Sequence, residues 1–297
     1  MSGSIETEGL TKRYGKLLAV DGANLSLGQN ETLGFIGPNG AGKSTFMKML
    51  LGIARPSSGS ARVLGLDIRR YSVPIRRRVG YLPGDLGFYR NLTGGKFLEF
   101  CLSFYQQADR QQAKRLSDQF DLPLKKKVKD YSTGMRQKLG LIQAFSVGGD
   151  LLILDEPTKG LDPTSQVLVA DMLAEQNRLG RGVLLSSHIL EEVERICHRI
   201  VFIDRGRIID PETISRTRDR FRHTLRVSFH EGAAPDLTGI ESVTEVRREG
   251  PQFVLRVEGP VEPVLHALAT LGVESLEYNR PSLVDIYRSL YLKGGSG

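Results

Sequence analysis

The sequence predicts an α/β domain that carries a helical insert and is followed by a small α+β domain. Its 297 residues suffice for about two domains, since a domain averages roughly 150 residues. Up to about residue 210, short apolar runs alternate with helical stretches, which is typical of a parallel sheet covered by helices. Beyond that point apolar residues recur with period two, which indicates an antiparallel sheet with one exposed face. We place the first domain at residues 1–215 and the second at 216–292.

The composition is that of a globular protein. Hydrophobic residues make up 40% and charged residues 25%, which is too apolar for a disordered chain. No apolar run approaches the roughly 18 residues of a membrane span, and the polar, acidic start is unlike a signal peptide. The net charge of +7 suits several anionic partners, but no Trp and no aromatic-rich basic stripe supports a nucleic-acid surface. Two distant cysteines, Cys101 and Cys197, fit a reducing cytosol and no disulfide scaffold.

Four apolar runs are the expected parallel strands of the first domain. Each is short and apolar on both faces, as expected for a strand that is covered on both sides. The runs are Thr32–Ile36, Leu151–Leu154, Gly182–Ser187 and Ile200–Ile203. The stretch Phe46–Leu51, which follows the first run, is expected to be helical.

A helical insert is predicted at about residues 88–147. Its first helix shows one apolar face, with residues at the i, i+4, i+7 and i+8 spacing of an α-helix. These residues are Phe97, Cys101, Phe104 and Tyr105. A second helix is expected over Arg110–Phe120, and a third begins after Ser132.

The second domain is expected to be a small α+β unit without a catalytic cluster, so a dimer brace or a regulatory role is favoured over a second active site. It is joined to the first through Thr217–His223. The expected strands are Thr224–Phe229, Val243–Val246, Phe253–Val257 and Val273–Tyr278, and the expected helices are Val261–Leu271 and Ser282–Tyr291. Residues 293–297 resemble an added linker and are left out of the fold.

The most specific motif lies directly after the first strand. Residues 37–44 read G-P-N-G-A-G-K-S, which matches the phosphate-loop pattern G-x-x-x-x-G-K-[S/T]. Its glycines let backbone N–H groups close around an anion, and the following helix start adds positive charge. Lys43 is placed to reach the β- and γ-phosphates, and Ser44 to bind Mg²⁺. The expected nucleotide-binding residues of this loop are Gly37, Pro38, Asn39, Gly40, Ala41, Gly42, Lys43, Ser44 and Thr45.

Two carboxylates follow the second apolar strand. Hydrolysis of a nucleoside triphosphate needs a further contact to the metal and a group that handles water. Asp155 is expected to hold Mg²⁺, directly or through water. Glu156 is expected to polarise the attacking water as a general base.

Further motifs occur in an order that resembles the ATP-binding subunits of ABC transporters over about residues 4–210. Tyr14 matches the aromatic residue that stacks on adenine in that family. The segment Tyr131–Lys138 resembles the family signature, Gly160–Asp162 the loop that crosses the dimer, and His188 the histidine that contacts the γ-phosphate. The resemblance assigns the signature and dimer-loop roles to Ser132, Thr133, Gly134, Met135 and Asp162.

The resemblance implies a P-loop ATPase with ATP and Mg²⁺ as its ligands. A second ATP-binding subunit, expected to be a second copy, would place its signature helix start on the γ-phosphate. A separate multi-spanning permease would dock on the helical insert from the cytoplasmic face of the membrane. Phe88, Tyr89 and Phe97 either line the docking cleft or belong to the core, and the sequence does not decide between these alternatives.

Three departures from the family pattern bear on these expectations. Gly84 stands where the family usually has Gln or Glu at the metal, so Asp85 or water is expected to substitute. In the signature, Thr133 replaces the usual Gly and Met135 the usual Gln. This variant is similar to exporter subunits of the drug-resistance, sodium-extrusion and polysaccharide-export types, as is the tail segment Pro281–Tyr287.

Two other functions fit the sequence less well. A soluble ABC ATPase that acts on DNA or chromosomes would carry long coiled coils between phosphate loop and signature, and a ribosomal one would carry two ATPase domains in one chain. Only about 90 residues separate the two motifs here, and they contain no heptad run. A P-loop kinase of another family would leave Ser132, Asp162 and His188 unexplained together.

Overall fold

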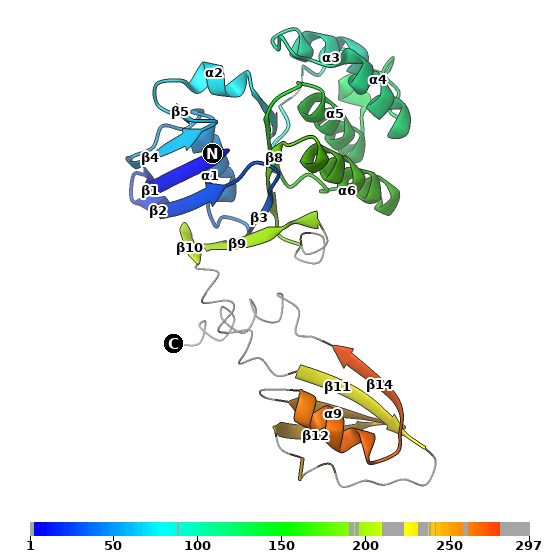
Figure 1. Cartoon of the computed structure of the whole chain (residues 1–297). Helices are drawn as coiled ribbons and strands as arrows, with labels where there is room; N and C mark the ends of the chain where they lie inside the picture. The colour runs from blue at the N-terminus through cyan, green and yellow to red at the C-terminus, as the bar shows by residue number, and fades with distance from the viewer. Residues whose placement is uncertain are drawn as a thin grey trace. The chain divides into compact units, whose positions relative to one another are not determined.

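The computed structural model describes residues 3–87, 89–189, 193, 196–209, 223–230, 237, 239–240, 242–257 and 261–279. The chain divides into two compact units, Met1–Ile209 and Asp210–Gly297 (Figure 1). Phe88, the segment 217–222, the helix expected over Ser282–Tyr291 and the tail motif Pro281–Tyr287 lie outside the described residues.

A six-stranded sheet forms the centre of the first unit, with strand order β10-β9-β3-β8-β7-β6. All of its pairs are parallel except β10 with β9. The strands are β3 (Thr32–Ile36), β6 (Val79–Leu82), β7 (Leu151–Asp155), β8 (Gly182–Ser187), β9 (Arg199–Asp204) and β10 (Arg207–Ile209). Every residue of β3, β7 and β8 is buried, which confirms that these apolar runs are covered on both faces.

A second, antiparallel sheet in this unit has the order β2-β1-β4-β5, and the sequence did not predict it. Its strands are β1 (Ile5–Tyr14), β2 (Leu17–Leu27), β4 (Ser58–Val63) and β5 (Leu66–Asp67). The pairing of β1 with β2 shifts register between Thr7 and Leu10 and again between Leu10 and Lys12. These irregularities break the two-residue alternation that identifies a strand in a sequence.

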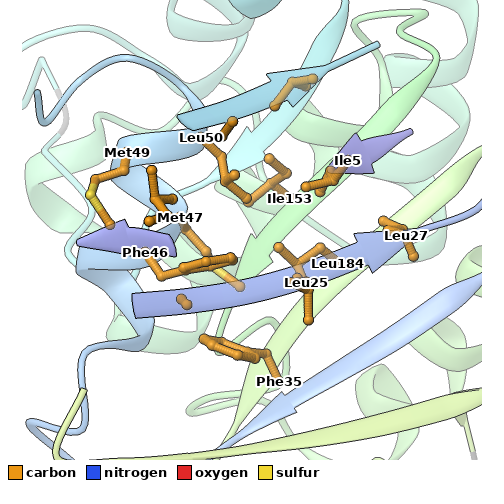
Figure 2. Close-up of a cluster of buried hydrophobic side chains, with 14 of the residues drawn as sticks. Ile5, Leu25, Leu27, Phe35, Phe46, Met47, Met49, Leu50, Ile153 and Leu184 are labelled. Atoms are coloured by element: carbon orange, nitrogen blue, oxygen red, sulfur yellow. The ribbon is translucent and has the colours of Figure 1, made fainter. Parts of the chain in front are cut away.

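The core of the unit gathers around α1 (Lys43–Leu50), the helix that follows the phosphate loop (Figure 2). Phe46, Met47, Met49 and Leu50 are fully buried. The Phe35 ring on β3 packs against the Phe46 ring with a centroid distance of 5.0 Å. Burial of a side chain of this size contributes about 1.5–3 kcal/mol, so the start of α1 is fixed firmly to the sheet.

The remaining helices of this unit are α2 (Ser72–Arg76), α3 (Gly94–Leu102), α4 (Arg110–Gln119), α5 (Thr133–Phe145) and α6 (Pro163–Arg178). Four of these helices have an N-cap residue whose side chain accepts a hydrogen bond from a backbone N–H of the first turn. These capping residues are Thr93 for α3, Asp109 for α4, Ser132 for α5 and Asp162 for α6. The expected helices of the insert are therefore present, although α3 ends at Leu102 and leaves Phe104 and Tyr105 beyond it.

The second unit is an antiparallel sheet with strand order β12-β13-β11-β14 and one described helix, α9 (Glu262–Ala269). Its strands are β11 (His223–Phe229), β12 (Val243–Glu249), β13 (Gln252–Val257) and β14 (Val273–Asn279). In order along the chain, the strands lie 4-1-3-2 across the sheet, as in a ferredoxin-like arrangement. The unit has its own core, which includes Leu225, Val227, Leu255, Val264 and Leu268.

Candidate functional site

The loop between β3 and α1 wraps tightly because two of its glycines take left-handed backbone angles. Gly40 has φ of 82° and Gly42 has φ of 107°. A Cβ atom on Gly42 would lie 2.2 Å from the carbonyl oxygen of Ala19, so no other residue fits there. The N–H of Gly206, in the turn between β9 and β10, donates to the carbonyl of Ala41 at 2.9 Å and anchors the loop.

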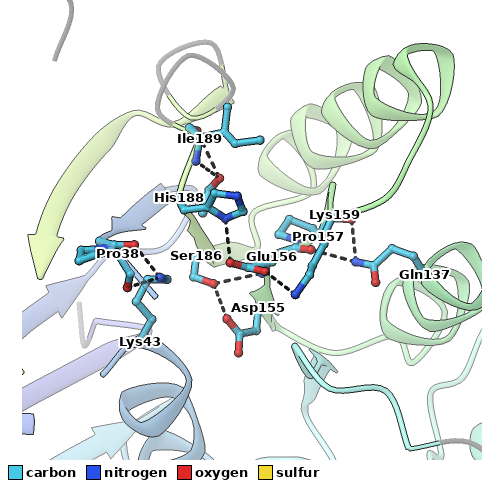
Figure 3. A network of polar contacts seen from close by, with 12 residues as sticks. Pro38, Lys43, Gln137, Asp155, Glu156, Pro157, Lys159, Ser186, His188 and Ile189 are labelled. Atoms are coloured by element: carbon cyan, nitrogen blue, oxygen red, sulfur yellow. Dashed lines mark hydrogen bonds and ion pairs between the residues drawn. The ribbon is translucent and has the colours of Figure 1, made fainter. Parts of the chain in front are cut away.

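Lys43 is a buried lysine, only 6% exposed, at the first position of α1. Its Nζ donates to the carbonyl oxygens of Gly37 at 2.6 Å and Pro38 at 3.0 Å (Figure 3). Burial lowers the pKa of Lys43, and the charges of Glu156 and Asp155 act in the opposite direction. The ammonium group is thus held at the loop, where a phosphate would give it a stronger partner than neutral carbonyls do.

The structure brings most of the predicted site residues to one pocket of about 550 Å³. From the predicted set, the pocket is lined by Tyr14, Asn39, Gly40, Gly42, Lys43, Ser44, Thr45, Asp85, Asp155 and Glu156. Leu17, Leu18, Lys48, Lys159 and Arg205 are among the other lining residues. The volume is in the range of pockets that hold small organic ligands and cofactors.

Asp155 ends β7 and is 2% exposed. Its Oδ1 accepts a hydrogen bond from the Ser186 hydroxyl on β8. Its Oδ2 is buried and, among the described residues, has no hydrogen-bond partner. A buried carboxylate oxygen without a partner is costly, and oxygen ligands are those that Mg²⁺ prefers. Asp155 and the Ser44 hydroxyl therefore fit a Mg²⁺ ion in this pocket.

Neighbouring residues contact both the backbone N–H of Glu156 and the two oxygens of its carboxylate. Its φ of 51° is left-handed, and its N–H donates to Ser186. Oε1 lies 2.9 Å from Nδ1 of His188, and Oε2 lies 3.0 Å from Nζ of Lys159 (Figure 3). Burial raises the pKa of Glu156, but hydrogen bonds and charges from Lys159 and His188 outweigh it, so the pKa lies below its ordinary value. The same contact raises the pKa of Lys159.

The signature segment connects to Glu156 through its helix and not through the pocket. Gln137 on α5 is buried, and its Nε2 donates to the carbonyls of Glu156 at 2.9 Å and Pro157 at 3.0 Å. A Cβ on Gly134 would lie 2.9 Å from the carbonyl oxygen of Gly160, so α5 starts tightly against the loop before α6. The predicted signature and dimer-loop residues do not line the phosphate pocket; they are Ser132, Thr133, Gly134, Met135 and Asp162.

Tyr14 lies at the outer part of the same pocket and is about half exposed. The Nζ of Lys12 lies 4.7 Å from the centroid of its ring. An exposed aromatic face beside a phosphate pocket suits stacking on a nucleotide base. Arg205 also lines the pocket.

Gly84 lies close to the carboxylate of Asp155. A Cβ at this position would lie 2.9 Å from Oδ2 of Asp155, so a side chain here would require that carboxylate to shift. The next residue, Asp85, lines the pocket. The prediction that Asp85 acts on a metal ion in this pocket therefore stays a prediction, which a substitution can test.

We expect the Asp85→Ala variant to need about tenfold more Mg²⁺ for half-maximal ATP hydrolysis, because outer-shell partners of metals typically contribute 10- to 100-fold in affinity. Phosphate release measured against Mg²⁺ concentration checks this. Asp171→Ala, which removes an exposed carboxylate from α6, is the matched control. An unchanged Mg²⁺ requirement in Asp85→Ala would show that Asp85 does not act on the metal.

Three residues that contact Asp155 or Glu156 were not predicted as parts of the site. The sequence places Ser186 in a strand and Gln137 in the signature segment, and it gives no indication of a role for Lys159. Gln137 lies on the apolar face of the expected helix, where the structure buries it. A glutamine on such a face is a sequence signal, since a buried polar group needs a hydrogen-bond partner. For Ser186 and Lys159 the sequence carries no such signal, because their roles depend on where β7 and β8 meet.

A parallel sheet in which a glycine-rich phosphate loop opens a helix, with carboxylates at the end of β7, defines a P-loop NTPase. The family model described as ABC transporter matches residues 20–159. The daunorubicin resistance ATP-binding protein of Streptomyces coeruleorubidus is 33% identical over 98% of this chain and 96% of its own length. The chain therefore belongs to the ATP-binding proteins of ABC transporters, which are ATPases that bind ATP with Mg²⁺.

Two further comparisons agree with this assignment. The Nod factor export ATP-binding protein I of Cupriavidus metallidurans is 33% identical and covers 98% of both chains. A solved structure of the ATP-binding subunit of an ABC transporter matches with a TM-score of 0.65 and 29% identity, over 71% of this chain and 92% of that one. Within the part of the chain that the structure describes, no helix has the length and apolar character needed to cross a membrane.

Proposed function

We propose that this chain is the ATP-hydrolysing subunit of an exporter. Two copies of the chain enclose two Mg-ATP. The dimer closes and opens, and this motion drives export through a separate membrane permease. The two copies bind to the cytoplasmic face of that permease. The names of the relatives support the direction of transport, since one is a drug-resistance protein and another a Nod factor export protein. The observation that carries the proposal is that the signature residues lie outside the phosphate pocket of their own chain.

Within one protomer, the residues divide the chemistry between them. The phosphate loop and Lys43 bind the phosphates, and Tyr14 stacks on the adenine. Ser44 and Asp155 hold Mg²⁺, which neutralises charge on the phosphates when it is bound. Glu156 takes the proton of the attacking water, and His188, whose Nδ1 lies 2.9 Å from Oε1 of Glu156, orients that carboxylate. The contact of His188 with the γ-phosphate is proposed from the family resemblance.

The second copy supplies what one pocket lacks. Ser132 and Thr133 are exposed at the start of α5, a helix of 13 residues, and the positive end of its dipole suits a phosphate of another chain. Charge-assisted hydrogen bonds contribute about 1.5–3 kcal/mol each. A few of them only just offset an association cost of about 4–15 kcal/mol. The dimer is therefore expected to form with ATP and to loosen after hydrolysis.

The permease is proposed to dock in a groove of about 520 Å³ beside the helical insert. Tyr89 and Phe104 are about 60% exposed there, and each packs edge-to-face against Phe100. Phe97 is buried and yet lines the groove, so the insert contributes both core and surface aromatic residues. Arg76 and Arg77 are the charged residues that line it. An apolar permease segment with an acidic residue fits these features.

The experiment is size-exclusion chromatography with light scattering on the Glu156→Gln variant, with and without Mg-ATP. We expect the mass to double from 32.9 kDa when ATP is added, because bound ATP is then not consumed. The Ser132→Arg substitution in the same background is expected to prevent the dimer and to leave ATP binding intact, since Ser132 is outside the pocket. A Glu156→Gln protein that binds ATP and stays monomeric would contradict the proposal.

A further inference from the structure

Lys159 lies against the carboxylate that the proposed function places next to the attacking water. Its Nζ is 3.0 Å from Oε2 of Glu156, and Nδ1 of His188 is 2.9 Å from Oε1 (Figure 3). The Glu156 side chain is 11% exposed, so it is largely enclosed. One basic group comes from the loop after β7 and the other from the end of β8, and together they hold the carboxylate from two sides.

Hydrogen bonds hold the backbone of the loop that carries Glu156 and Lys159. The N–H of Lys159 donates to the carbonyl of Glu156 at 3.2 Å and closes a turn. Gln137 binds the carbonyls of Glu156 and Pro157 from the other side. The turn places Lys159 three positions after Glu156, and from there its Nζ reaches Oε2 of the carboxylate in the same turn.

Lys159 also contributes to the charge balance of the pocket. The lining residues include three carboxylates, Asp85, Asp155 and Glu156, and four basic side chains, Lys43, Lys48, Lys159 and Arg205, and the phosphates of ATP would add negative charge. Like charges a few ångströms apart repel one another, and the Glu156 side chain would rotate away from Asp155 if nothing restrained it. Lys43 donates to the loop carbonyls. Among the described residues, the side chains that contact the Glu156 carboxylate are those of Lys159 and His188.

We propose that Lys159 is a positioning residue for ATP hydrolysis: its ammonium group, together with His188, holds the Glu156 carboxylate in the orientation that receives the attacking water. The inference rests on the proposed role of Glu156. Lys159 acts through Glu156 and does not itself take the proton. Loss of the ammonium lets the carboxylate rotate, which lowers the fraction of productive complexes without changing the phosphate loop that binds ATP.

The test compares Lys159→Met with Lys159→Arg in the full-length protein. We expect kcat of Lys159→Met to fall about tenfold, with KM and the dissociation constant of a non-hydrolysable ATP analogue within about twofold of wild type. Lys159→Arg keeps the charge and is expected to recover kcat to within about threefold of wild type. Lys114→Met, which removes an exposed lysine from α4, is the matched control and is expected to keep the wild-type rate.

Three results would overturn the inference: an unchanged or higher kcat in Lys159→Met, a loss of analogue binding as large as the loss of kcat, or an arginine variant as slow as the methionine variant. Glu156→Gln, assayed alongside, separates this inference from the proposed function. If Glu156→Gln is inactive and Lys159→Met is fully active, only the role of Lys159 is wrong. If Glu156→Gln stays active, the proposed role of Glu156 is wrong as well.

Discussion

The Glu156→Gln variant is expected to lose at least about 100-fold in the rate of ATP hydrolysis while it still binds Mg-ATP. A positioned general base contributes typically 10²- to 10⁴-fold, and a glutamine amide cannot take the proton of the attacking water. Gln has the size of Glu, and the backbone contacts of this residue to Ser186 and Gln137 do not involve its side chain. The substitution therefore removes the chemistry and keeps the geometry of the loop.

The measurement is phosphate release at saturating Mg-ATP, together with equilibrium binding of labelled ATP. Glu175→Gln makes the same chemical change at an exposed position of α6 and is expected to keep the wild-type rate. If Glu156→Gln hydrolyses ATP within about tenfold of wild type, another group activates the water. His188 is the group in contact with Glu156 that would then be tested next.

The sequence predicts the buried strands of the first unit well, because a short apolar run can be recognised without knowing which strands it pairs with. Thr32–Ile36 and Gly182–Ser187 have in the structure the same bounds that the apolar runs indicate. A strand that is covered on both faces is mostly apolar, so the ends of the apolar run lie at or close to the ends of the strand. The helix that was expected to begin after Ser132 is α5, and in the structure Ser132 caps it.

The antiparallel sheet of the same unit was not predicted. β1 (Ile5–Tyr14) mixes buried and exposed residues, and Gly9 within it has φ of 55° at the point where the register shifts. A strand with such a bulge loses its regular alternation, and only its pairing with β2 and β4 identifies it. Strand pairing depends on the folded chain, so the local sequence of each segment does not predict this sheet.

The same distinction applies to the site. The residues that are predicted to contact the ligand belong to local motifs, and the structure gathers Lys43, Asp155 and Glu156 at one pocket. The residues that hold these groups come from other elements, as Ser186 does for Asp155 and Gln137 for the backbone of Glu156. Their partners are 31 and 19 positions away in the sequence, so no local pattern links them.

The Lys43→Met variant is expected to lose at least about 100-fold in affinity for ATP. Two charge-assisted hydrogen bonds to phosphate oxygens contribute about 1.5–3 kcal/mol each, and 1.4 kcal/mol corresponds to a factor of ten in affinity. The ammonium is already buried and held at the loop by the carbonyls of Gly37 and Pro38, so little side-chain entropy is lost when a phosphate binds. Methionine fills nearly the same space with an apolar tip, so the packing of α1 against Phe35 is kept.

Calorimetric titration with ATP and Mg²⁺ measures the loss, and thermal unfolding checks that the fold survives. Lys48→Met is the matched comparison, because Lys48 lies on the same helix and lines the same pocket without a hydrogen bond to the loop carbonyls among the described contacts. Its loss removes one positive charge at longer range, and we expect its affinity for ATP to fall by less than about tenfold. Equal losses in the two variants would show that Lys43 contributes only through general charge, and the phosphate-loop account of this pocket would then be wrong.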